Sequence, residues 1–111
     1  MSETVYVETS VVGYLTARLS NNLILMANLG ITQEWWDTRR EQFTLYISPP
    51  PKASDDALHI AVATFYGIDY LLTWNCKHIA NAQIQKKLAQ ISIEAGYDLP
   101  TICTPNELMG D

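Results

Sequence analysis

The sequence predicts an α/β fold with a mainly parallel sheet. Short runs of β-branched and aromatic residues alternate along the chain with segments of helical periodicity, and capping or turn residues separate them. Strands that alternate with helices favour parallel strands joined by helical crossovers. The 111 residues are 48% hydrophobic and 17% charged, which is enough apolar material for one compact core, so a single domain over residues 1–111 is expected.

The N-terminal half is expected to contain two strands and two helices. These are a strand over 4–7, a helix that starts near Val11, a helix over 23–40 and a strand over 43–48. The polar run Ser20–Asn22 supplies capping residues for the longer helix. Three prolines at 49–51 then form a sharp boundary, because proline cannot continue either a helix or a central strand.

The C-terminal half repeats the alternation of helix and strand. The expected elements are a helix over 55–66 capped by Ser54 and closed by Gly67, a strand over 70–74, a helix over 80–95 ended by Gly96, a strand over 100–103, and a terminal helical turn capped by Thr104. The acidic pair Asp55 and Asp56 lies in the first turn of its helix, where the helix dipole favours negative charge.

Charge and cysteine content argue against several classes of protein. A net charge of -5 argues against nucleic-acid binding through bulk positive potential, so any such contact must be local. Cys76 and Cys103 are far apart and form no CxxC pair, which supplies neither a disulfide framework nor a four-ligand zinc site, and a reduced, cytoplasmic location is expected. The most apolar window, residues 23–31, is too short to span a bilayer, so neither membrane insertion nor secretion is expected.

Polar side chains gather at the expected carboxyl ends of two strands. Glu8, Thr9 and Ser10 follow the first strand, Asn75 follows the strand over 70–74, and Asp56 begins the helix before that strand. Ligands of parallel α/β sheets bind outside these strand ends, and hard divalent cations take oxygen ligands. Taken alone, each segment is also explained as a solvated strand end, a dipole partner or a turn, so the prediction of a site depends on their combination.

Three short motifs occur in a characteristic order. They are Tyr6-Val7-Glu8-Thr9-Ser10-Val11, Asp56-Ala57-Leu58-His59-Ile60-Ala61-Val62-Ala63 and Leu71-Leu72-Thr73-Trp74-Asn75. In this order they resemble the acidic first strand end, the later acidic helix and the Thr-x-Asp strand end of PIN-domain proteins of the VapC-like toxin type. The resemblance covers nearly the whole chain outside the proline region, and it implies a PIN-like three-layer fold that lacks part of its central region.

The resemblance assigns a role to each matching residue. Glu8 and Asp56 would be metal-binding carboxylates, and Asn75 would stand where the family has a further acid, so these three form the implied catalytic set. Ser10 and Thr73 would be supporting hydroxyls. Asp55 is a further supporting candidate on its position alone, because a carboxylate beside Asp56 would partly compensate for a neutral Asn75, although successive helix positions point about a quarter turn apart.

Two departures from the family pattern weaken the implied site. Asn75 offers a carbonyl oxygen but no charge to a hard cation. In the family, a helix that bears another metal-site acid lies between the strand over 43–48 and the acidic helix, and here only residues 49–53 fill that gap. Glu34 and Glu41 do not replace this acid, because both precede the strand.

The function implied by the resemblance is metal-dependent cleavage of RNA, with Mg²⁺ or Mn²⁺ as the cofactor, weakened activity, and an antitoxin protein as a possible partner. The alternative is an impaired PIN remnant that acts as a homodimer or an antitoxin-binding module through apolar surface exposed by the missing elements. A nucleotide-binding module ranks last, because no glycine-rich phosphate loop follows any strand.

Several other residues carry weaker expectations. Lys52 and Lys77 are candidates for phosphate contacts. Trp35, Trp36 and Trp74 are able to stack on bases, but large aromatic residues in a small domain are more often found in the core or at an interface.

Overall fold

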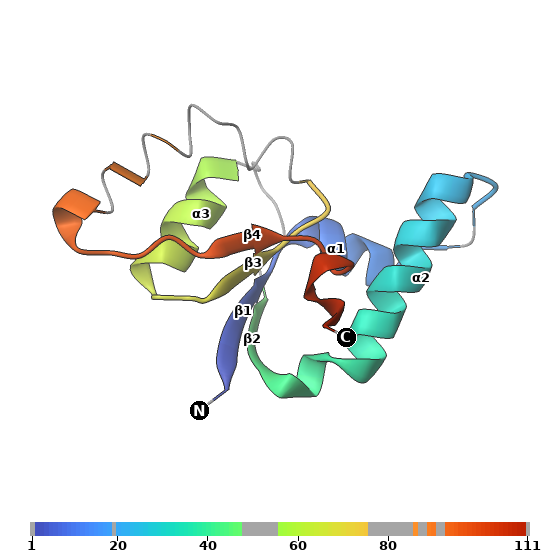
Figure 1. Cartoon of the computed structure of the whole chain (residues 1–111). Coiled ribbons are helices and arrows are strands. Elements are labelled where there is room, and N and C mark those ends of the chain that lie inside the picture. Colours follow the sequence, from blue (N-terminus) through green and yellow to red (C-terminus); the bar gives the residue numbers. More distant parts are fainter. Residues whose placement is uncertain are drawn as a thin grey trace.

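The computed structural model of the chain describes residues 2–18, 20–47, 56–75, 86, 89, 90 and 93–110, and for residues 56–59 it describes the backbone alone. Its centre is a four-stranded parallel sheet (Figure 1). The strands are β1 (Glu3–Val7), β2 (Phe43–Ile47), β3 (Tyr70–Leu72) and β4 (Thr101–Cys103), arranged in the order β2-β1-β3-β4. The expected α/β class with a parallel sheet is therefore confirmed.

Helical segments lie between the strands and after the last of them. They are α1 (Thr9–Leu15), α2 (Leu23–Thr38), the short 3₁₀ segment η1 (Arg40–Gln42), α3 (Asp56–Phe65) and the 3₁₀ segment η2 (Glu107–Met109). Of the helix expected over 80–95, the described residues 86, 89, 90 and 93–95 are helical. Gly67 and Gly96 follow their helices with φ of 66° and 80°, the left-handed conformation that glycine adopts without steric cost.

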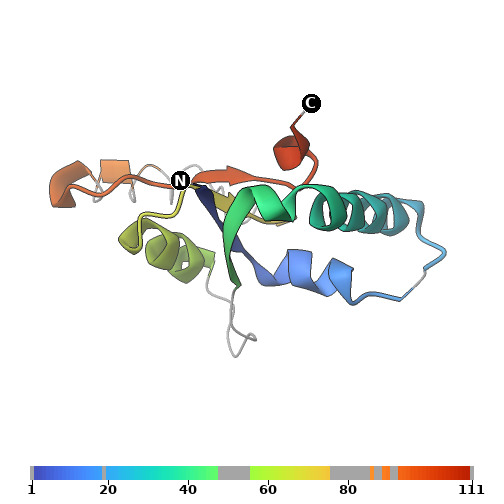
Figure 2. The same cartoon turned by 90° about the horizontal axis from the view of Figure 1, so that it is seen from below.

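The sheet separates two apolar clusters, because alternate residues of a strand point to opposite faces. On one face, Val5 and Val7 of β1 pack in a cluster with Trp35 of α2. On the other face, Tyr6 of β1 packs in a cluster with Ile60 of α3. In both views α3 lies on the opposite side of the strands from α2 (Figure 1 and Figure 2), which gives a layer of helices on each face of the sheet.

The strand order creates a switch point between β1 and β3. From β1 the chain crosses through α1 and α2 to β2 on one side, whereas from β3 it continues to β4 on the other side. Connections that leave two adjacent parallel strands in opposite directions open a crevice at their carboxyl ends, which is where ligands of such sheets bind. The residues that follow Val7 and Leu72 therefore lie where a ligand of such a sheet is expected.

The amino ends of β1 and β3 are also joined. The backbone N–H and the Oγ1 hydroxyl of Thr4 donate to Oδ2 of Asp69 at 2.8 and 3.1 Å, and the backbone N–H of Asp69 donates to Thr4 Oγ1 at 2.9 Å. This reciprocal set of hydrogen bonds fixes the register of the two strands at the end away from the switch point.

Two expected caps are confirmed. Oδ1 of Asn22 accepts hydrogen bonds from the backbone N–H groups of Ile24 and Leu25 and so caps α2. Near the C-terminal end, Thr104 and Glu107 form a capping box, in which Thr104 Oγ1 accepts from the N–H of Glu107 and the N–H of Thr104 donates to Glu107 Oε1.

Several element boundaries differ from the sequence prediction. The strand expected over 70–74 ends at Leu72, because both neighbouring strands end opposite this residue, β1 at Val7 and β4 at Cys103. The helix expected over 23–40 ends at Thr38, after which the chain tightens into η1. The prolines at 49–51, the expected cap Ser54, and Asp55 lie outside the described residues.

Among the described residues, no helix combines the length and the apolar character that a bilayer span needs.

The packing of the central strands gives a first prediction. Leu72 is fully buried, whereas Leu23 is 85% exposed. We expect Leu72→Ala to lower the free energy of unfolding by about 2–5 kcal/mol, because it removes buried methyl groups and leaves a cavity. Leu23→Ala makes the same chemical change at the surface and should alter stability by less than about 0.5 kcal/mol. Urea denaturation of both variants measures the difference, and equal losses would contradict the described core.

Candidate functional site

Glu8 lies at the carboxyl end of β1 and begins α1 as its N-cap. Its backbone N–H donates to the carbonyl of Leu72 at 3.0 Å, which extends the pairing of β1 with β3 to the switch point. The side chain is only 4% exposed. A carboxylate is thus buried at the point where the topology predicts a ligand site.

Neutral donors satisfy this carboxylate. Oε2 accepts hydrogen bonds from the hydroxyl of Thr9 and from the backbone N–H of Ser10, both at 2.7 Å. Oε1 accepts a hydrogen bond from Thr73 Oγ1, also at 2.7 Å. The bond from Ser10 is the N-cap interaction of α1, so the start of this helix and the position of the carboxylate are fixed together.

The residues after β3 complete the polar cluster. The backbone N–H of Trp74 donates to Ser10 Oγ at 2.9 Å, and the N–H of Asn75 donates to Thr73 Oγ1 at 2.9 Å. The hydroxyls of Ser10 and Thr73 lie 3.3 Å apart. The structure therefore brings Ser10, Thr73 and the backbone of Asn75 together with Glu8.

Glu8 is held in its ionised form. Burial alone would raise its pKa, but the hydrogen bonds from its neighbours outweigh burial and hold the pKa of Glu8 below its ordinary value of 4.5. Among the described residues, the donors to this carboxylate are hydroxyl and amide groups, which stabilise its negative charge without neutralising it.

The structure gives less detail for the other expected site residues. Asp56 begins α3, which ends just before the turn into the amino end of β3, so the first turn of the helix lies toward the carboxyl edge of the sheet (Figure 1). The backbone of Asp56 is described but its side chain is not, and Asp55, Lys52 and Lys77 lie outside the described residues.

The donor set fits a hard divalent cation in part. An ionised carboxylate offers about four lone-pair positions. Oε2 of Glu8 accepts hydrogen bonds from Thr9 and Ser10, and Oε1 accepts one from Thr73. The anionic carboxylate supplies oxygen ligands of the kind that hard divalent cations take. Within the described part of the chain, no three His, Cys, Asp or Glu side chains converge as a metal-binding group. The side chains of Asp55 and Asp56, two of the expected site residues, lie outside the described part of the chain.

Sequence reasoning missed two threonines that organise this region. Thr9 lies in the polar run after β1 but received no separate role, although its hydroxyl binds Glu8. Thr32 lies on α2, and its hydroxyl accepts a hydrogen bond from the indole N–H of Trp74 at 2.7 Å. The only signal for Thr32 was its spacing from Asn28, four residues earlier, which places two polar residues on one side of an apolar helix.

The tryptophans divide between core and surface. Trp35 is fully buried in the cluster beneath β1, as expected for a core residue. Trp36 is partly buried, and the guanidinium of Arg40 lies 4.6 Å from the centroid of its ring. Trp74 is partly buried beside the polar cluster, with the ring of Tyr14 packed edge to face against it.

Comparison with known proteins gave no match: no protein-family model, no curated protein and no solved structure is significantly similar to the chain.

The ionised state of Glu8 predicts how stability depends on pH. A carboxyl group whose pKa is lower in the folded state than in the unfolded state stabilises the fold above its unfolded pKa, here near 4.5, and this contribution disappears as the pH falls through the folded pKa. We expect Glu8→Gln to lower the free energy of unfolding at pH 7 by roughly 1–3 kcal/mol, because an amide cannot accept all of these hydrogen bonds.

Chemical denaturation between pH 7 and pH 2 provides the measurement. The difference in stability between the wild type and Glu8→Gln should be constant near neutral pH and should shrink as the pH falls below the ordinary carboxyl pKa of 4.5. Glu94→Gln, which changes an exposed carboxylate, serves as the control at pH 7 and should cost less than about 0.5 kcal/mol. A difference that stays constant down to pH 2 would contradict an ionised, hydrogen-bonded Glu8.

Proposed function

We propose that the chain is a metal-dependent endoribonuclease of the PIN type with a weakened metal site. The observation that supports this most directly is the buried, ionised Glu8 at the switch point between β1 and β3. A structural N-cap requires neither burial nor retained charge, and serine or asparagine would serve as well. A buried anion surrounded by neutral donors suits a site whose ligand is a cation.

Different residues would bind the metal ion and hold its ligands in position. Glu8 from β1 and Asp56 from α3 would bind Mg²⁺ or Mn²⁺, while the hydroxyl of Thr73 and the backbone of Ser10 hold the Glu8 carboxylate in place. The bound ion would lower the pKa of a water ligand and neutralise charge that develops on the scissile phosphate. The residue that follows Trp74 is Asn75, which would contribute a neutral oxygen to this edge of the site.

The charge of this ligand set explains why activity should be weak. Hard cations bind more tightly as the number of carboxylate ligands rises. Asn75 is neutral, and no residue matches the acid that the PIN pattern places between β2 and α3. The metal would therefore occupy only part of the molecules at ordinary concentrations.

Metal titration of RNA cleavage tests the proposal. Purified protein with a mixed RNA pool should cleave slowly in Mg²⁺ and faster as Mn²⁺ is raised. Asn75→Asp should lower the metal concentration needed by roughly tenfold, which corresponds to about 1.4 kcal/mol of binding free energy. Asp56→Ala should abolish cleavage.

Asn106→Asp is the matched control, because it adds the same charge at an exposed position of the C-terminal segment and should leave the titration unchanged. Strong cleavage at low Mg²⁺ that disappears in Asp56→Ala would contradict the weakened site. Cleavage that persists in Asp56→Ala would come from a contaminating nuclease and would remove the support for an enzyme.

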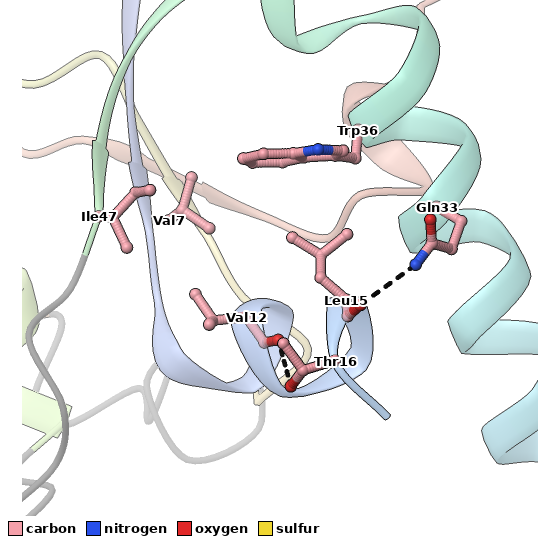
Figure 3. A pocket seen from close by; sticks show the side chains of 7 residues that line it. All are labelled: Val7, Val12, Leu15, Thr16, Gln33, Trp36 and Ile47. Atoms are coloured by element: carbon pink, nitrogen blue, oxygen red, sulfur yellow. Dashed lines mark hydrogen bonds between the residues drawn. The ribbon is translucent and has the colours of Figure 1, made fainter. Parts of the chain in front are cut away.

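A second function, binding of a protein partner by an impaired PIN-like domain, has support of its own from a pocket between α1 and α2 (Figure 3). The pocket has a volume of about 290 Å³. Its lining is formed by Val7, Val12, Leu15, Thr16, Gln33, Trp36 and Ile47. Most of these side chains are apolar, and the amide of Gln33 ties the two helices together by donating to the carbonyl of Leu15 at 3.3 Å. Such a pocket suits an apolar side chain of an antitoxin-like protein.

The start of α2 presents a further apolar surface. Leu23 is 85% exposed and Ile24 is 72% exposed, and both lie in the first turn of the helix. Adjacent apolar side chains of this size in contact with water favour association, and a homodimer is the simplest closed assembly.

We expect the wild-type protein to form a dimer at high micromolar concentration, measured by light scattering. The double variant Leu23→Lys and Ile24→Lys should be monomeric, because two like charges would face their symmetry copies across the interface. Ile93→Lys changes a side chain that is 79% exposed elsewhere and should remain dimeric. A monomeric wild type at this concentration would contradict self-association.

A further inference from the structure

Thr32 of α2 hydrogen-bonds Trp74, whose backbone belongs to the polar cluster around Glu8. The indole N–H of Trp74 donates to Thr32 Oγ1 at 2.7 Å, and the same hydroxyl donates to the carbonyl of Asn28 at 2.6 Å. Thr32 is fully buried. Its hydroxyl thus has one function within the helix and a second one toward the residues that follow β3.

We propose that Thr32 is a positioning residue of the candidate site. Its hydroxyl binds the indole of Trp74 and so holds the segment after β3 in place. That Thr32 contributes to metal binding rests on the proposed metal-dependent function. The role of Thr32 in fixing the segment 73–75 does not depend on it.

Trp74 connects Thr32 to Glu8 through short contacts. The backbone N–H of Trp74 donates to Ser10, whose own backbone N–H donates to the Glu8 carboxylate. The preceding residue, Thr73, donates directly to Glu8 at 2.7 Å. A shift of the Trp74 backbone would therefore disturb bonds that hold both oxygens of the carboxylate.

The indole has a fixed orientation because two groups hold it. Thr32 binds its N–H, and the ring of Tyr14 packs against it at a centroid distance of 5.9 Å and an interplanar angle of 71°. The hydroxyl of Tyr14 in turn accepts a hydrogen bond from the side chain of Asn28 at 3.3 Å. Side chains of α1 and α2 thus both contact the indole of Trp74.

Volume alone does not explain the threonine at position 32. Valine has nearly the same shape and would fill the same space, but it would leave the indole N–H of Trp74 without its acceptor. Threonine also occurs at position 64 of α3, where it is 8% exposed and its hydroxyl donates to the carbonyl of Ile60 at 2.7 Å. Thr64 makes the same bond to the preceding helical turn as Thr32 does, so it separates the structural role from the positioning role.

The experiment compares Thr32→Val, Thr32→Ser and the matched control Thr64→Val. The first measurement is native-state hydrogen exchange of the backbone amides of Trp74 and Asn75, which donate to Ser10 and Thr73. The second is Mn²⁺ affinity at neutral pH, obtained from the electron paramagnetic resonance signal of free Mn²⁺. Neither measurement requires catalytic activity.

In Thr32→Val, these two amides should exchange about tenfold faster than in the wild type after correction for global stability, as expected for the loss of one buried hydrogen bond. Mn²⁺ binding should weaken by a similar factor. Thr32→Ser keeps the hydroxyl and should restore both values, whereas Thr64→Val should lower global stability and leave both values unchanged. Trp74→Phe removes the indole donor from the other side and should reproduce the effects of Thr32→Val.

The outcomes separate the two proposals. Faster exchange of the two amides in Thr32→Val, together with a wild type that binds no Mn²⁺, would support the positioning role and contradict the proposed metal site. A wild type that binds Mn²⁺ and whose affinity and amide exchange are both unchanged by Thr32→Val and Trp74→Phe would overturn the positioning role and leave the metal site intact. Equal effects from Thr32→Val and Thr64→Val would also overturn it.

Discussion

The hydrogen bond from the hydroxyl of Thr73 to the carboxylate of Glu8 joins the ends of the two central strands. A carboxylate that is 4% exposed is costly to bury unless its oxygens are satisfied, so the groups that bind it are constrained in position. The bonds to Glu8 hold the start of α1 and the residues that follow β3 in fixed positions relative to each other. One buried charge thus organises the polar cluster at the switch point.

The described donors to this carboxylate carry no charge, and this affects the electrostatic field around Glu8. A lysine or arginine in their place would satisfy the carboxylate and also cancel its field. The hydroxyl and amide groups of the described residues lower the pKa of Glu8 against the effect of burial and leave the negative charge of the carboxylate in place.

Local sequence signals predicted the alternation of strands and helices, the cap at Asn22 and the cap at Thr104. They also placed Glu8 directly after a strand, because a polar residue there interrupts an apolar run. Asn75 was expected directly after a strand as well but lies three residues beyond the end of β3. These signals failed where contacts distant in sequence decide. β3 stops at Leu72 because its neighbours β1 and β4 end opposite that residue, and Thr32 hydrogen-bonds a tryptophan 42 positions away. Neither partner could be identified from periodicity. The role of Asp56 depends on the position of its side chain, and neither the sequence nor the path of the backbone fixes that position.

The position of β1 in the middle of the sheet has a consequence for how the chain acquires its structure. β1 precedes its partners along the chain, yet one of its two neighbours begins at Tyr70, and the bonds at both ends of their pairing span 65 residues. Closing such a long loop costs chain entropy before any contact repays it, which slows folding. On the ribosome, β1 can pair with β2 before β3 has been made, so Thr73 reaches the carboxylate of Glu8 only at a later stage. The buried environment of Glu8 therefore forms late in folding.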